Sequence, residues 1–137
     1  MSNHGLTPNP VRLSPSGQHC FFGYYDLPAW STHGEQHLAH RVAFADRIPS
    51  ASDVAEVGYL QGGVFHALGK TTAWNFQQGA MLQWIPTSPE LFIYNQRTKE
   101  GYGSVIQSTG GRIHRHLPRP VANVNPRGRF ALSINFA

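Results

Sequence analysis

The sequence predicts an all-β fold made of consecutive antiparallel meanders of about four strands. Glycine and proline interrupt the chain often, with 14 and 10 copies in 137 residues, and the longest stretch free of both is residues 35–48. Because an average helix already needs about 11 or 12 residues, few segments could form one. The other two observations are a short turn that recurs along the chain and an alternation of apolar and polar residues after it.

The recurring turn has three clear copies and one weaker copy. The clear copies are Leu13–Gly17, Trp30–Gly34 and Val124–Gly128, and in the weaker copy, Trp84–Glu90, Ser-Pro stands where the others have glycine. Serine or asparagine caps such a turn, proline presets φ where it is present, and glycine accepts the positive φ that closes it. Each copy therefore predicts the start of a strand.

Strands are expected directly after these turns. Residues 91–95 predict a strand buried on both faces. Residues 38–48 could be scored as a helix, but Val42 and Phe44 after a turn favour a strand. Residues 129–136 predict a half-buried strand, since alternate side chains form one apolar face. That face consists of Phe130, Leu132, Ile134 and Phe136.

Partner strands are expected between the units. They are residues 54–60, 63–68 and 71–76 and the two arms of a hairpin over residues 105–116. Gly110-Gly111 suits a two-residue turn in that hairpin. Residues 46–53 are expected to form an exposed loop, and residues 1–12 a flexible segment before a single domain over residues 13–137.

The spacing of the turns is that of four-stranded propeller blades. Trp30 and Trp84 are 54 residues apart and Trp84 and Val124 are 40 apart, close to the roughly 40 to 50 residues of a WD40-like blade. The four-stranded sheets expected are therefore of β-propeller-blade type. Trp74 and Trp84 are expected to fill the space between blades.

Three longer stretches carry a resemblance to a known family. They read SPSG…CFFGYYDLPAWSTHGEQHLAHRV, WNFQQGAMLQWIPTSPELFIYNQR and RPVANVNPRGRFALSINF. Together they resemble, from Leu13 onward, the amino-terminal blades of bacterial β-propellers of the TolB-like and oligogalacturonate-lyase-like group. The pattern from Trp74 to Tyr94 is the most specific part. The resemblance implies a ring of about six or seven blades, of which this chain would supply about three.

The last predicted strand favours self-assembly. The apolar face of residues 129–136 has no later sequence to cover it, and unpaired strand edges invite association. Two copies of about three blades would give about six, within the range at which propellers close. We therefore expect a homo-oligomer, a two-fold dimer in which oligomerisation completes the propeller. An edge-paired dimer that forms no ring is the alternative.

The GYYD motif and the tryptophan that follows it form the most distinctive cluster of side chains. Sugar-binding sites combine flat aromatic faces with polar groups for the hydroxyls. Tyr24, Tyr25, Asp26 and Trp30 are therefore candidate ligand-binding residues, for an oligosaccharide or a protein partner, and Arg115 is added for an acidic group. The alternative is structural, with Tyr25 and Trp30 packed between blades and Asp26 capping a turn.

The eight histidines suggest a second function. His114 and His116 are two residues apart, so in a regular strand both rings point to the same face and could bind one divalent metal ion. Asp26 or a glutamine would add an oxygen ligand. Such an ion and Arg115 would serve a metal-assisted lyase or hydrolase acting on acidic oligosaccharides. Histidines that are hydrogen-bonded or exposed, without metal, are the alternative.

Other functional classes find little support in the sequence. It contains no GxSxG motif, phosphate loop or CxxC motif, and its seven carboxylates form no compelling pair. The net charge of +4 is dense only over residues 112–119, which lack the aromatic residues of a single-strand nucleic-acid platform. No apolar stretch reaches the roughly 18 residues of a membrane span. The start has no signal-peptide pattern, so a soluble cytoplasmic protein is expected.

The sequence as a whole favours a non-catalytic, propeller-like module that assembles with itself and binds a saccharide or a protein. No cofactor and no catalytic residue is assigned to that module. A metal-assisted enzyme and a truncated gene product without activity of its own are the two alternatives.

Overall fold

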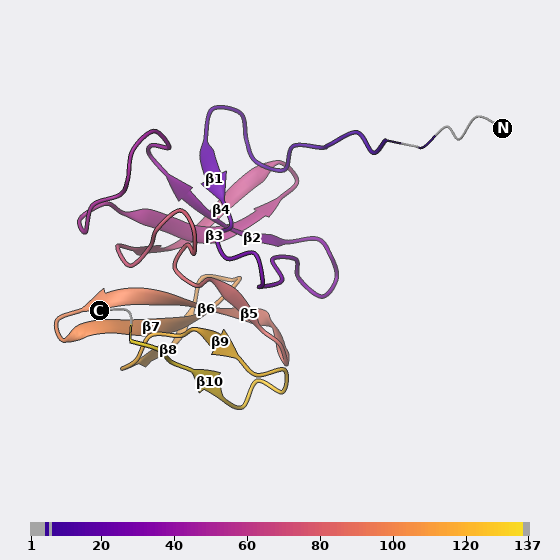
Figure 1. The fold of residues 1–137 in the computed structure, drawn as a ribbon. Helices are drawn as coiled ribbons and strands as arrows, with labels where there is room; N and C mark the ends of the chain where they lie inside the picture. Colours follow the sequence, from indigo (N-terminus) through magenta and orange to yellow (C-terminus); the bar gives the residue numbers. More distant parts are fainter. Residues whose placement is uncertain (1–4, 6, 136–137) are drawn as a thin grey trace.

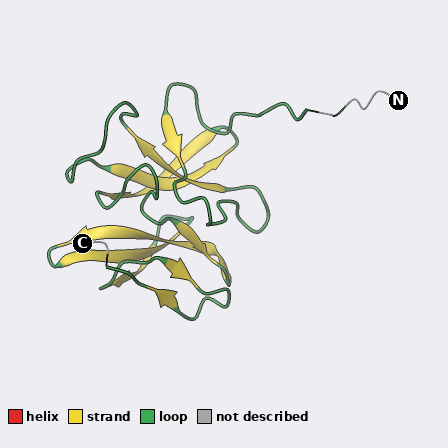
Figure 2. Cartoon of the chain, in the orientation of Figure 1, coloured by secondary structure: helices red, strands yellow, loops and turns green. Residues whose placement is uncertain are grey.

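The computed structural model describes residues 5 and 7–135. The described residues form ten strands and no helix (Figure 2), which confirms the expected all-β class. Among these residues there is consequently no helix that could span a membrane. The strands make two antiparallel four-stranded sheets and one two-stranded sheet, which follow one another along the chain (Figure 1).

The first sheet is a meander in the order β1-β2-β3-β4. Its strands are β1 (His19–Phe21), β2 (His37–Val42), β3 (Ala55–Gln61) and β4 (Val64–Thr71). Gly62 and Gly63 close the β3–β4 hairpin with φ of 60° and 75°, because two successive positive φ values match the twist of the flanking strands. Of the strand expected over residues 38–48, residues 38–42 belong to β2 and the remaining residues form a loop.

The second sheet repeats the same meander in the order β5-β6-β7-β8. Its strands are β5 (Gln83–Ile85), β6 (Ser88–Thr98), β7 (Gly101–Ser108) and β8 (Ile113–Leu117). The prediction of a two-residue turn at Gly110-Gly111 is wrong. Ser108 N–H donates to the Arg112 carbonyl and Gly111 N–H to the Ser108 carbonyl, both at 2.9 Å, so the turn holds three residues and only Gly111 needs a positive φ.

The third sheet is the short hairpin of β9 (Asn123–Val124) and β10 (Ala131–Leu132). Two buried amide side chains tie the segment before and within β9 to the second sheet. Asn95 Oδ1 accepts from Val121 N–H at 2.6 Å, and Gln83 Oε1 accepts from Val124 N–H at 3.1 Å. Because these amides lie in the interior, their hydrogen bonds fix where the third sheet begins.

The recurring turn has the expected geometry. Its three glycines, Gly17, Gly34 and Gly128, have φ of 75°, 70° and 65°. The N–H groups of Gly34 and Gly128 donate to the carbonyls of Ser31 and Asn125, each at 2.8 Å. The copies that start at Trp30, Trp84 and Val124 each connect the first two strands of a sheet.

The first and second sheets pack against each other through one apolar cluster. Its buried members from both sheets include Leu38, Val57, Phe92, Tyr94 and Val105. Polar bridges fix the contact. Gln107 Nε2 donates to the Leu68 carbonyl at 2.7 Å and Thr71 Oγ1 donates to the Asn95 carbonyl at 2.6 Å. The two predicted structural tryptophans, Trp74 and Trp84, are buried in the same cluster.

The prediction of a strand over residues 71–76 is wrong. Thr71 ends β4, and residues 72–82 form an irregular connection to the second sheet with a single bridge between Asn75 and Gly79. Side chains satisfy the backbone there. Thr71 Oγ1 accepts from Ala73 N–H at 3.0 Å and Asn75 Oδ1 accepts from Gln78 N–H at 2.7 Å. Such local hydrogen bonds compete with a strand ladder.

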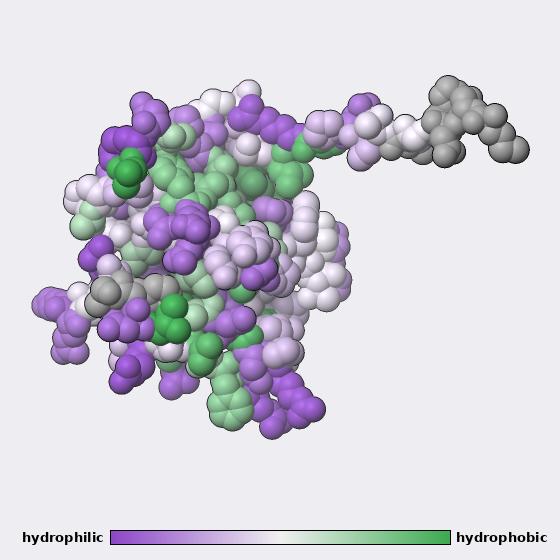
Figure 3. All heavy atoms as spheres, in the orientation of Figure 1, coloured by the Kyte–Doolittle hydropathy of each residue, from purple (hydrophilic) through white to green (hydrophobic). Residues whose placement is uncertain are grey.

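The prediction of a half-buried strand over residues 129–136 is also wrong, both in the length of the strand and in its burial. Only Ala131–Leu132 are in a strand, and Phe130, Leu132 and Ile134 are 74%, 64% and 49% exposed. Figure 3 has apolar atoms at the surface in the region of β9 and β10. The reason is that these three side chains belong to none of the apolar clusters formed by the described residues. Phe136 lies outside the described residues.

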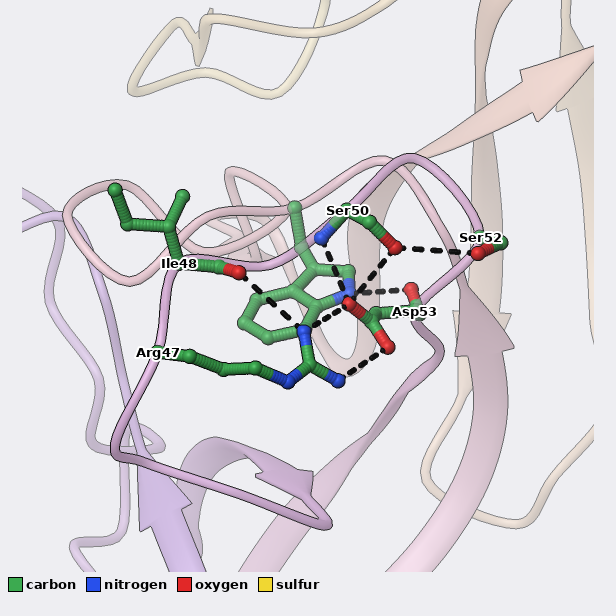
Figure 4. Close-up of polar contacts among 6 residues, drawn as sticks. Arg47, Ile48, Ser50, Ser52 and Asp53 are labelled. Atoms are coloured by element: carbon green, nitrogen blue, oxygen red, sulfur yellow. Dashed lines mark hydrogen bonds and ion pairs between the residues drawn. The ribbon is translucent and has the colours of Figure 1, made fainter.

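The loop over residues 46–53 is mostly exposed, as expected, but strongly hydrogen-bonded (Figure 4). The Arg47 guanidinium donates to both carboxylate oxygens of Asp53 at 2.7 and 2.9 Å, and Ser50 N–H donates to Asp53 Oδ2 at 2.7 Å. These donors hold the pKa of the Asp53 carboxyl well below its usual range. The Trp74 indole N–H donates to the Asp53 carbonyl at 2.8 Å, so the loop is anchored to the core.

Candidate ligand-binding site

The GYYD motif lies in an excursion from the edge of the first sheet. Phe21 pairs with His40 of β2, and Trp30 pairs with His37 only three residues earlier on β2. The chain therefore leaves the sheet at Phe21 and returns at Trp30, and residues 22–29 project as a loop. Loops held at both ends by a rigid sheet commonly carry binding residues.

Tyr25 and Asp26 are at the tip of this loop. Leu27 N–H donates to the Tyr24 carbonyl at 3.2 Å, which puts Tyr25 and Asp26 at the centre of a β-turn. Tyr25 is 83% exposed, and its ring is 5.3 Å from that of the half-buried Tyr24. The Asp26 side chain is exposed and has no hydrogen-bond partner within the described chain. Among the described ring pairs, Tyr25 therefore contacts only its neighbour Tyr24.

Trp30 lines a shallow groove beside the loop. The groove is about 160 Å³ and is walled mostly by aromatic, aliphatic and proline side chains, with one threonine: Pro28, Trp30, Thr32, Trp84, Ile85, Pro86 and Pro89. Trp30 is 46% exposed, and its ring meets that of His37 edge to face at 4.9 Å. Trp84 is held in place because its indole N–H donates to the Ala29 carbonyl at 2.9 Å. The groove thus offers a fixed apolar surface.

The loop over residues 22–29 contacts the connection between the two sheets, residues 72–82. The side chain of His40 is fully buried, and its Nε2 accepts from Ala80 N–H at 2.9 Å. A Cβ atom at Gly23 would lie 2.6 Å from the Gly79 nitrogen. The backbones of the loop and the connection therefore touch, and only glycine fits there.

Two histidines under this loop have their pKa lowered by burial. Burial lowers the pKa of His40 to about 4, against a smaller opposing effect of the Phe21 and Phe22 carbonyls. Burial also lowers the pKa of His37. The Nδ1 atom of each ring has no hydrogen-bond partner of good geometry in the part of the chain that the structure describes. Both rings instead pack against aromatic neighbours, His40 stacking on Phe21 at 4.9 Å.

A second, smaller cavity is lined by the connection and by residues of β6 and β7. It has a volume of about 130 Å³, and its lining includes Trp74, Gln78, Met81, Arg97 and Tyr102. The Arg97 guanidinium is 4.9 Å from the centre of the Tyr102 ring. No carboxylate forms an ion pair with Arg97 among the described residues. The cavity thus presents hydrogen-bond donors that suit a hydroxyl or a carboxylate.

Met81 marks this region as strained. It has φ of 53° and is the one non-glycine residue with positive φ in the described part of the chain. It is buried against Leu27 and Ile93. Such conformations persist where the surrounding structure fixes them, often at functional sites.

The remaining candidate residues, His114, Arg115 and His116, lie together on β8. This strand is at the opposite edge of the second sheet from β5, which carries Trp84. All three side chains are exposed. In the register, Ile106 is opposite Arg115 and Gln107 is opposite Ile113, so His114 is the extra residue of a bulge. The regular alternation on which the shared face of His114 and His116 depends is interrupted there.

The described residues do not gather three His, Cys, Asp or Glu side chains at one point. Metal binding by His114 and His116 stays a prediction, as does ligand binding by Arg115.

Sequence reasoning missed the support beneath the loop and the cavity beside it. The side chain of His40 is buried, and its hydrogen bond to Ala80 joins residues 40 positions apart. No local pattern reveals such a contact. The cavity joins Trp74 to Arg97 through tertiary packing alone.

The chain matches no protein-family model, and comparison with curated protein sequences and with solved structures finds no significant match.

Proposed function

We propose that this protein is a non-catalytic, propeller-like module that assembles with copies of itself and binds a saccharide on the loop and groove around Trp30. The resemblance to TolB-like and oligogalacturonate-lyase-like propellers motivates the first half of this proposal. Two successive antiparallel meanders of four strands, packed face to face, support it.

Self-assembly is supported by the third sheet. It has two strands where each of the others has four, and a two-stranded hairpin alone is marginally stable in water. Phe130 and Leu132 are largely exposed on it. Two copies, each with two complete sheets and a partial third, would supply about six blades, within the range at which propellers close.

The observation that carries saccharide binding is the exposure of Trp30 over a rigid groove. Trp30 is 46% exposed, and its ring is fixed by an edge-to-face contact with His37, so it offers a platform for the apolar face of a sugar ring. The exposed Tyr25 phenol and Asp26 carboxylate lie on the adjoining loop and offer hydrogen-bonding groups for hydroxyls. This combination of a fixed aromatic surface and a few polar groups is typical of small-ligand sites.

A glycan array of neutral and acidic oligosaccharides, followed by calorimetry on the best binder, tests this proposal. Trp30→Ala should weaken binding at least about tenfold, the loss of roughly 1.4 kcal/mol, while the unfolding midpoint changes little. Tyr25→Ala and Asp26→Ala should each reduce the free energy of saccharide binding by more than they reduce the free energy of unfolding. Ile48→Ala, at another exposed apolar side chain, is the matched control and should bind normally. An empty array, with capture of a protein instead, would reject the saccharide.

A further inference from the structure

One edge of β10, called here its free edge, pairs with no strand among the described residues. The carbonyls of Phe130 and Leu132 accept from Asn125 N–H at 2.9 Å and Ala122 N–H at 2.7 Å, so they point toward β9. Backbone groups of successive strand residues point to opposite edges. Those of Ala131 and Ser133 therefore point away from β9, and no strand among the described residues pairs with that edge.

The N-terminal segment, residues 7–13, has the pattern of a strand that pairs on one side only. Residues 7–12 are exposed and form no strand within the chain, and the segment runs away from the sheets in Figure 1. Pro8 and Pro10 lack an N–H and, being two residues apart, would block the same edge. The opposite edge keeps the N–H and carbonyl groups of Asn9, Val11 and Leu13. Proline in sheets is confined to such edge strands, with its own side facing solvent.

The side chains of the two segments also match. Ala131 is opposite Val124, and Val124 packs toward the second sheet with the cluster of Ile93. A strand paired with Ala131 through Val11 would place Val11 and Leu13 on that same inward face. Pro8 and Pro10 would lie on the outer face, which holds the exposed Phe130 and Leu132.

We infer that residues 7–13 of one copy add to the free edge of β10 in a second copy, as the third strand of its third sheet. The donor is a second copy because the segment leaves from the first sheet while β10 lies beyond the second sheet (Figure 1). Addition of an extended segment to an exposed sheet edge is a common way for backbone hydrogen bonds to supply affinity. This inference rests on the proposed self-assembly and names its contact.

Two proline substitutions in the same exposed segment test the inference. Val11→Pro removes an N–H on the pairing edge, whereas Arg12→Pro removes one on the edge already blocked by Pro8 and Pro10. In sedimentation velocity, the oligomer of the Val11→Pro variant should have a dissociation constant at least about tenfold higher than that of wild type. The Arg12→Pro variant should differ from wild type by less than about twofold. Equal effects of the two prolines would overturn strand addition and leave self-assembly standing.

A peptide experiment gives a second, independent readout. A fluorescent peptide of residues 5–15 should bind the full-length Val11→Pro variant, whose β10 edge is then free, with a rise in anisotropy. Adding Ser133→Pro to that variant should abolish binding, because it removes an N–H from the receiving edge. Absence of peptide binding would overturn the inference even if the wild-type chain is monomeric. A monomeric wild-type chain that still binds the peptide would reject the proposed assembly and retain the strand-addition site.

Discussion

The Nε2 atom of His40 accepts a hydrogen bond from the backbone N–H of Ala80 at 2.9 Å. His40 belongs to β2 of the first sheet, and Ala80 precedes β5 of the second. This one contact therefore holds the connection between the sheets under the loop that carries the GYYD motif. Because a neutral imidazole accepts at only one nitrogen, the contact also fixes the tautomer with hydrogen on Nδ1.

Replacing His40 by glutamine should reduce the pH dependence of stability. The pKa of His40 falls from 6.5 to about 4 on folding because burial disfavours the charged ring. Between these pH values the unfolded chain binds more protons. The free energy of unfolding therefore falls as the pH drops from 6.5 to 4, by up to about 3 kcal/mol, and His40 adds no further loss below that.

Urea unfolding at pH 7.0, 6.0 and 5.0 measures this effect above the range in which carboxylates titrate. His37, whose pKa burial also lowers, adds a smaller loss of the same sign and remains in the His40→Gln variant. His33→Gln, in an exposed turn, is the control and should keep the wild-type slope. Identical slopes for His40→Gln and wild type would show that His40 does not act in this way.

An alanine at Gly23 should destabilise the protein far more than one at Gly17. Both glycines have positive φ, of 112° and 75°, but a Cβ at Gly23 would meet the Gly79 backbone at 2.6 Å while one at Gly17 has nothing within 4 Å. Gly17→Ala should cost about 1 kcal/mol from backbone conformation alone, and Gly23→Ala more than about 3 kcal/mol. Comparable costs in chemical denaturation would mean that loop and connection do not touch.

The turns and most strands could be predicted from local sequence, because their causes are local. Glycine at the end of the three clear copies of the turn reports the positive φ directly, and Gly17, Gly34 and Gly128 all have it. The strand expected over residues 71–76 failed for a reason that periodicity does not contain. Thr71 and Asn75 satisfy backbone groups with their side chains, and that depends on a turn already being formed.

The candidate site was predictable only in its exposed part. Tyr25, Asp26 and Trp30 are grouped in the sequence. The first two lie at the tip of the loop over residues 22–29, and Trp30 lies where the chain returns to the sheet. The groove beside Trp30 needs Trp84, which is 54 positions away in sequence, and the second cavity needs Arg97 beside Trp74. Sheet packing makes these contacts, and a single sequence carries no local trace of them.

Asp53→Asn should loosen the loop over residues 46–53 without unfolding the protein. The carboxylate accepts hydrogen bonds from Arg47 and Ser50, and an amide cannot accept both contacts of the guanidinium. Trypsin should then cleave after Arg47 several-fold faster. Asp46→Asn, at an exposed carboxylate in the same loop, should leave the cleavage rate unchanged. Equal cleavage of Asp53→Asn and wild type would show that the ion pair does not order the loop.

Metal analysis separates the binding module from the metal-assisted alternative. If the protein is a non-catalytic module, plasma mass spectrometry of purified protein should find no stoichiometric manganese, zinc or calcium. Stoichiometric metal that is lost when His114 and His116 are both changed to alanine would instead establish the metal site on β8. Metal that survives both changes would place the ligands elsewhere in the chain.

The mass of the protein in solution tests self-assembly most directly. The proposal of self-assembly rests on the exposed Phe130 and Leu132 and on an edge of β10 with which no described strand pairs, and a two-fold pair is the simplest arrangement that covers both. Light scattering coupled to size-exclusion chromatography, at micromolar concentration, should give about twice the chain mass of 15.2 kDa. A stable, unaggregated species at 15.2 kDa would contradict the account, because it would show that a single copy is self-sufficient.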